Sequence, residues 1–179
     1  MLNNIAALVG TPVGDYESIA TTTLSTATAS ITFSSIPATY KHLQIRGISR
    51  ITSGSYAQVL YQLNGATGSS YSRHYLFGDG STTAAAGTAS TTNMFGGIMS
   101  GSTQTASIFG ALVTDILDYT NTNKNTTIRT LSGVDGNGSG YAWFSSGAYL
   151  STDAITSITI IPESSTFVQY SSFALYGIN

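Results

Sequence analysis

The sequence has little charge. Its six Lys and Arg residues and eight Asp and Glu residues make up 8% of 179 residues, and the net charge is −2. A typical soluble domain has about 25% charged residues. Because nucleic acids and anionic membranes attract clustered basic side chains, we expect neither as a partner.

Cysteine is absent, which excludes disulfides, thiolate catalysis and cysteine-ligated zinc sites. No apolar run approaches the roughly 18 residues that a membrane-spanning helix needs, so we expect no membrane insertion. The first residues, MLNNIAALVG, contain no basic region. We therefore expect no signal peptide.

Hydroxyl residues, glycine and aromatics are abundant instead. The chain contains 26 Ser, 27 Thr and 19 Gly, and 41% of its residues are hydrophobic and 11% aromatic. Disordered chains show the reverse pattern of few aromatics and much charge. A folded, β-rich domain is expected, because Thr and Tyr favour strands. Its weak charge repulsion would suit a protein that assembles.

Residues 1–15 differ from the rest and are interpreted as an N-terminal arm. Leu2, Ile5, Leu8 and Val9 follow a helical spacing, and the Gly and Pro residues of 10–14 end the pattern. A helix this short is unstable alone in water and needs a partner surface. The arm could fold back on its own domain, remain a frayed terminus, or dock on a sister subunit or a larger assembly.

Residues 16–179 read as a single domain of short strands broken by turns. The strands are expected near 16–24, 28–34, 41–51, 55–64, 71–77, 91–99, 103–119 (one or two strands), 126–133, 140–150, 154–161 and 166–178. Short strands without intervening helices predict an all-β fold, an antiparallel β-sandwich of jelly-roll type. An immunoglobulin-like sandwich is the second choice, because such a domain normally has only about 100 residues and the range 16–179 is longer.

The residue pattern of several strands gives more detailed predictions. Ala57, Val59, Tyr61 and Leu63 alternate onto one face of a strand that ends at the turn pair Asn64-Gly65.

The apolar phase changes at Gly47, which suggests a β-bulge there. The run SIFGALVTDILDY is apolar on both faces, as expected for a strand buried on both sides or entering a subunit interface. Phe173 and Leu175 share one face of the last strand, with Tyr176 and Ile178 on the other.

Turns are predicted at Asp79-Gly80, Asp135-Gly136, Asn137-Gly138 and residues 120–126. The low-complexity stretch 78–93 is expected to be an extended surface loop, or a region ordered only against a neighbour.

The sequence offers little for catalysis. His42 and His74 are the only histidines, and the G-x-S-x-G motif is absent, so we interpret both as surface or interface residues. Asp115 and Asp118 are the only close carboxylate pair in an apolar strand. A spacing of three places them on opposite faces, so they do not suit a glycosidase. We expect them to cap turns or to pair with Arg129 or Lys124.

No cofactor or metal is expected. Residues 135–140 alternate Asp, Asn and Ser as calcium loops do, but the closing Glu and flanking helices are missing, which favours a plain glycine turn. Tyr71, Arg73 and Tyr75 share one strand face. Such a face could stack on a sugar or lie in a protein interface, while core packing for part of it is equally expected.

Four segments carry a family resemblance: YESIATTTLSTATASITFSSIPATYKHLQIRGISR, YSRHYLFGDGS, DILDYTNTNKNTTIRTLSG and AITSITIIPESSTFVQYSSFALYGI. Together they extend across residues 16–178. They resemble a group of small β-rich structural proteins of tailed bacteriophages. These segments are strands and turns without a catalytic or binding motif, so the resemblance identifies no functional residues.

The resemblance implies a non-enzymatic protein on the exterior of the phage particle, made in the host cytoplasm and often trimeric. Capsid decoration (cement) or head-fibre proteins would contact the major capsid protein or another virion protein, here through the arm. The alternative is a tail-fibre or receptor-binding adhesin that recognises host polysaccharide through residues 78–93, residues 135–140 or the Tyr/Arg face. The short chain without a coiled-coil shaft favours decoration.

Overall fold

The structure, a computed structural model, describes residues 14–179 and contains twelve strands. Eleven of them overlap the ranges predicted above, with bounds that differ by up to seven residues. The strands are β1 (Tyr16–Thr23), β2 (Ile31–Phe33), β3 (His42–Ser49), β4 (Tyr56–Leu63), β5 (Tyr71–Gly78), β6 (Thr83–Thr91), β7 (Met94–Ser100), β8 (Gly110–Leu117), β9 (Thr126–Asp135), β10 (Gly140–Tyr149), β11 (Ile158–Pro162) and β12 (Ser172–Ile178).

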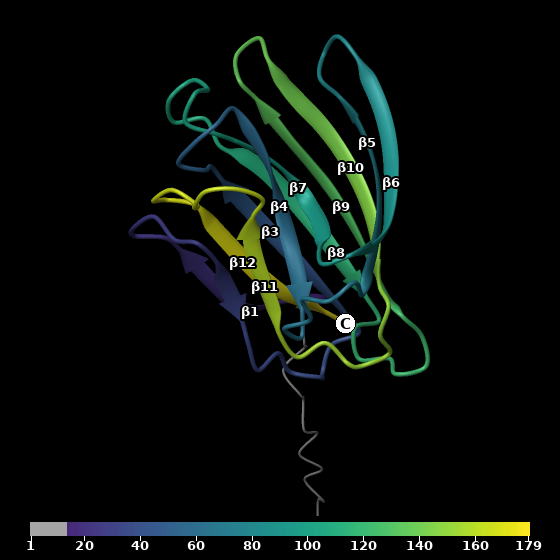
Figure 1. Ribbon diagram of the computed structural model, residues 1–179. Coiled ribbons are helices and arrows are strands. Elements are labelled where there is room, and N and C mark those ends of the chain that lie inside the picture. The colour runs from purple at the N-terminus through teal and green to yellow at the C-terminus, as the bar shows by residue number, and fades with distance from the viewer. Residues whose placement is uncertain (1–13) are drawn as a thin grey trace, which may run out of the picture.

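The strands form two antiparallel sheets packed as a sandwich (Figure 1), which confirms the all-β sandwich prediction. The large sheet has eight strands in the order β1-β12-β3-β8-β9-β10-β5-β6, and the small sheet has four in the order β2-β11-β4-β7. The hairpins β5–β6 and β9–β10 project together at one end of the molecule. Within residues 14–179, no helix is long and apolar enough to cross a membrane.

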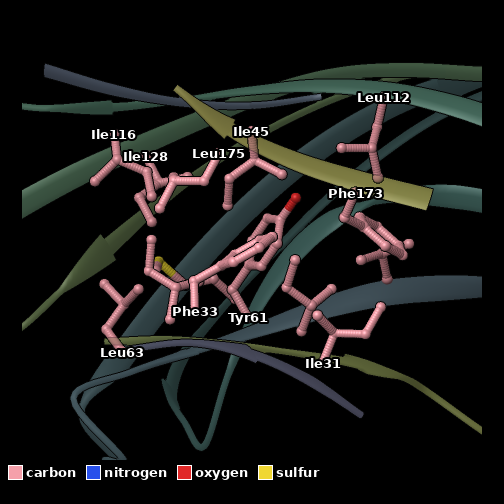
Figure 2. Packing of buried hydrophobic residues seen from close by; sticks show 14 of the residues in the cluster. Ile31, Phe33, Ile45, Tyr61, Leu63, Leu112, Ile116, Ile128, Phe173 and Leu175 are labelled. Atoms are coloured by element: carbon pink, nitrogen blue, oxygen red, sulfur yellow. The ribbon is translucent and has the colours of Figure 1, made fainter. Parts of the chain in front are cut away.

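The main core fills the space between the sheets (Figure 2). Tyr61 and Leu63 of β4 face Ile45 of β3 and Leu175 of β12, and all four are fully buried. The alternation predicted for 55–64 and for the last strand is therefore confirmed. The Tyr61 hydroxyl forms a hydrogen bond with Thr114 Oγ1 at 2.9 Å, so the polar atom brought into the core is satisfied.

Two predictions from the sequence are wrong. Residues 83–91, expected within a surface loop, form strand β6 at the edge of the large sheet. The expected bulge at Gly47 is absent, because β3 pairs in unbroken register with both neighbours. Gly47 instead makes room for the ring of Phe173, whose Cδ1 would lie 2.6 Å from an added Cβ.

The predicted turns are confirmed where glycine and asparagine adopt positive φ. Asn64 and Gly65 have φ of 52° and 68°, and the Ala66 N–H donates to the Leu63 carbonyl at 2.9 Å. Asn137 and Gly138 similarly turn the chain between β9 and β10. These local turns fix where each strand ends and therefore which residues reach the hairpin tips.

Candidate assembly surface

Large apolar side chains are exposed on the outer face of the large sheet, away from the core. Leu131 is 66% exposed, Leu76 54%, Ile48 47%, Val113 41% and Phe144 40%. We call these five side chains the outer-sheet surface. In β9, Leu131 lies between Thr130 and Ser132, both of which are buried, so strand alternation alone turns it outward.

Four of these residues form one continuous row. Strand pairing places Val113 opposite Leu131, Leu131 opposite Phe144, and Phe144 opposite Leu76. The row then continues to Ala85 in β6. Directly opposed side chains on one sheet face lie about 5 Å apart and contact each other. The four residues therefore make an apolar ridge across β8, β9, β10 and β5.

Shallow grooves follow this ridge on both sides. One, of about 480 Å³, is lined by Leu76, Leu131 and Phe144 together with the small residues Gly78 and Ala142. The second, of about 420 Å³, is lined by His74, Ala85, Gly87, Phe144 and Ser146, among others. An apolar ridge with grooves can interdigitate with side chains of a partner surface, as protein interfaces do at their centres.

The charged side chains of the neighbouring polar row are all held by contacts within the chain. Arg129 Nε lies 3.0 Å from Asp115 Oδ2, and Gln44 Nε2 donates to Asp115 Oδ1 at 2.8 Å. Arg46 Nε donates to Gln44 Oε1 at 2.8 Å, and its guanidinium lies over the ring of Tyr176. The few charged groups here have partners within the chain.

Of the three residues predicted as an interface or glycan-binding face, Tyr71 belongs to the core. Its ring is fully buried and stacks on Tyr149 at 5.1 Å. Its hydroxyl accepts from the Leu63 N–H and donates to the Ala66 carbonyl, both at 2.9 Å. Burial raises the pKa of this phenol. Tyr71 therefore follows the core-packing alternative for this face rather than the interface or glycan-binding one.

Arg73 and Tyr75 lie further along the same face of β5, partly exposed. The Arg73 guanidinium lies 3.7 Å from the ring centroid of Phe95 and donates to Asn93 Oδ1 at 2.8 Å. Burial lowers the pKa of this guanidinium from its ordinary value. The Tyr75 ring stacks on Trp143 at 4.7 Å. Tyr75 thus packs against a second apolar cluster that includes Phe95 of β7 and Trp143 of β10, and Arg73 lies against its Phe95.

A polar cleft lies between the tips of the two projecting hairpins. Its volume is about 380 Å³, and Asp79, Asp135, Ser139 and Tyr141 are among the residues lining it. The Tyr141 ring contacts Tyr56 with centroids 4.9 Å apart. The Asp79 carboxylate accepts several hydrogen bonds that hold its pKa well below its usual range, and the bond from the backbone N–H of Thr82 has the largest effect. Asp79 is therefore anionic in neutral solution.

The His and Asp residues considered as catalytic candidates lie in separate local clusters. Lys124 forms an ion pair with Asp118, and Asp115 pairs with Arg129, which confirms the expected partners. His42 Nδ1 accepts from the Asp118 N–H at 2.9 Å, and His74 is exposed in β5. Within residues 14–179, no group of three or more His, Asp or Glu side chains could hold a metal ion.

Leu2, Ile5, Leu8 and Val9 of the predicted arm lie outside the described residues. Leu131 and Phe144 of the outer-sheet surface were missed because each lies in a mixed polar strand. The nearest signal was the run SIFGALVTDILDY, predicted to be buried on both sides or to enter a subunit interface. In β8 the burial alternates instead, with Leu112 buried and Val113 exposed.

Comparison with known proteins finds no matching family model, curated protein or solved structure.

Proposed function

We propose that this protein is a non-enzymatic structural protein of a tailed-phage virion, assembled from several copies through the outer-sheet surface. Capsid decoration or a head-fibre role, with residues 1–15 as the attachment arm, is the preferred form. The sequence pattern predicts a jelly-roll topology, and the family resemblance implies three copies. The phage assignment depends on the sequence resemblance, and the assembly on the surface described above.

The outer-sheet surface is the observation that carries the proposal. Five large apolar side chains gather on one sheet face, whereas isolated exposed apolar residues are ordinary on monomers. Water contact with such a patch costs free energy at about 25 cal/mol per Å² of apolar area. Covering the patch with a partner recovers that free energy. The two grooves supply the shape that such packing needs.

Leu131→Asp tests this assembly. The change places a charge at the centre of the apolar ridge, and we expect it to reduce the oligomer to monomers in light scattering. Tyr170→Asp is the matched control, because Tyr170 is also largely exposed but lies in the loop before β12. A wild-type monomer, or an oligomer unaffected by Leu131→Asp, would contradict assembly through this surface.

Location on the particle is tested by immunogold labelling or cryo-EM of virions. Decoration predicts hundreds of copies on the head and capsid binding that is lost when residues 1–15 are deleted. Full capsid binding by the truncated protein would refute the arm. Absence of the protein from purified virions would refute the virion assignment itself.

The hairpin-tip cleft favours a second candidate, a tail adhesin for host polysaccharide. Tyr141 offers a ring for stacking on a sugar, and Asp79 and Ser139 offer hydrogen-bonding groups. An adhesin predicts few copies at the tail tip and competition of free protein with phage adsorption. Tyr141→Ala should abolish that competition while Tyr170→Ala preserves it; competition unaffected by Tyr141→Ala would exclude the cleft.

A further inference from the structure

The two sheets have four edge strands, and three of them are protected against pairing with another chain. Strand β2 is only three residues long. Strand β1 contains Glu17 and an irregular register between Ser18 and Ala20. Every residue of β7 is buried. Short length, charge, irregularity and covering are the usual devices that keep sheet edges from associating.

Strand β6 has none of these devices along most of its length. It is nine residues long, TAAAGTAST, with neither charge nor proline, and eight of its residues are exposed. Its register with β5 is regular from Thr83 to Thr88 and shifts only near the far end. A long, uncharged and regular edge presents unpaired backbone groups to any strand that can approach.

The hairpin turn shows which backbone groups face outward. The Asp79 N–H donates to the Thr82 carbonyl at 3.1 Å, so these two residues form a hydrogen-bonded pair. Antiparallel pairs alternate between hydrogen-bonded and non-hydrogen-bonded positions. Ala84 and Ala86 therefore bond to β5, while the N–H and C=O groups of Thr83, Ala85 and Gly87 point to the open edge.

The side chains of β6 fit a second copy of the same strand. Antiparallel self-pairing centred on Ala85 places Thr83 opposite Gly87 and Ala84 opposite Ala86, within the regular part of the strand, so only small neutral side chains meet. No like charges are brought together, and Ala85 is itself one of the outward-facing residues. Self-pairing around a two-fold axis also repeats every contact twice.

We propose that β6 pairs antiparallel with β6 of a second copy, joining two large sheets into one continuous sheet. This inference rests on the proposed assembly and names a contact within it. Ala85 ends the cross-strand row that contains Leu76 and Phe144, so pairing also joins two outer-sheet surfaces edge to edge. The two-fold contact predicts an even number of copies: two for β6 alone, or six if three-fold contacts act as well.

Ala85→Pro tests the pairing. Proline removes the outward N–H at this position, and proline is tolerated at sheet edges. We expect the dissociation constant of the two-fold contact, measured by sedimentation equilibrium, to rise at least tenfold. Ala85→Ser keeps the N–H and a small side chain, so it should leave the constant unchanged. Circular dichroism melting curves show whether each variant is folded.

Hydrogen exchange on the wild-type full chain gives a second measurement that requires no variant. With β6 paired, the amides of Ala85 and Gly87 should exchange as slowly as those of Ala84 and Ala86, which bond to β5. With a free edge, Ala85 and Gly87 should exchange far faster than those two neighbours. Fast exchange at Ala85 and Gly87 in the oligomer overturns the proposal.

The outcomes separate this contact from the wider assembly. An oligomer that Ala85→Pro leaves intact but Leu131→Asp dissociates overturns β6 pairing and preserves the outer-sheet surface. A wild-type monomer overturns both. A dimer dissociated by Ala85→Pro but unaffected by Leu131→Asp supports β6 pairing and refutes the assembly through the outer-sheet surface.

Discussion

At the scale of single residues, the core of this protein depends on hydroxyl pairs as well as apolar packing. Tyr61 is fully buried, and its hydroxyl is bonded to Thr114, which also bonds Thr130 at 2.7 Å. Burial raises the pKa of Tyr61, so the phenol stays neutral. Three hydroxyls from three strands thus satisfy one another inside the sandwich.

Tyr61→Phe removes one of these three hydroxyl groups. We expect it to lower the free energy of unfolding by about 1 kcal/mol, because one buried hydrogen bond is lost while Thr114 keeps its bond to Thr130. Urea unfolding measures the change. Tyr170→Phe, at a largely exposed tyrosine, is the control and should change stability by less than about 0.5 kcal/mol. Equal effects of the two changes would show that the buried hydroxyl contributes nothing particular.

At the scale of elements, Arg50 holds the segment between β7 and β8. Its Nη1 donates to the carbonyls of Thr105 and Ile108, each at 2.8 Å, and its Nη2 to that of Gln104 at 3.0 Å. The side chain is buried. A single guanidinium therefore supplies three donors to a loop that has no regular secondary structure, and so fixes the start of β8.

Arg50→Met keeps the length of the side chain and removes its donors. We expect a loss of about 3 kcal/mol in the free energy of unfolding, because three carbonyls lose charge-assisted hydrogen bonds. Amides of residues 101–109 should also exchange faster with solvent. Arg129→Met is the control, since Arg129 is exposed and its ion pair should contribute less than about 1 kcal/mol. A smaller loss for Arg50 than for Arg129 would contradict the anchoring role.

The individual strands and turns show which parts of the fold could be predicted from the sequence. Turns such as Asn64-Gly65 depend on neighbouring residues, so they were found, and with them the strand ends. Strand β6 was missed because its Ala, Gly, Ser and Thr residues carry no apolar alternation. The glycine at 47 was misread because the residue it accommodates, Phe173, lies far along the chain. Arg50 could not be assigned a role, since its three partners are backbone carbonyls.

At the scale of the whole molecule, the scarcity of charge predicts how assembly responds to salt. Only 8% of the residues are charged, and beside the outer-sheet surface Asp115 and Arg129 already pair with each other while Arg46 is held by Gln44. Contacts made by apolar side chains and backbone hydrogen bonds are not screened by ions, whereas contacts between ion pairs are. Assembly should therefore depend little on ionic strength.

We expect the dissociation constant of the oligomer to change less than tenfold between 0.05 M and 1 M NaCl, as measured by sedimentation equilibrium. Sulfate salts should tighten the assembly, because they are excluded from apolar surface and strengthen its burial. A useful comparison is Leu131→Lys, whose added charge should weaken assembly at every salt concentration. If the dissociation constant of the wild-type oligomer rises tenfold or more with NaCl, ion pairs between copies, rather than the apolar ridge and the β6 edge, hold the oligomer together.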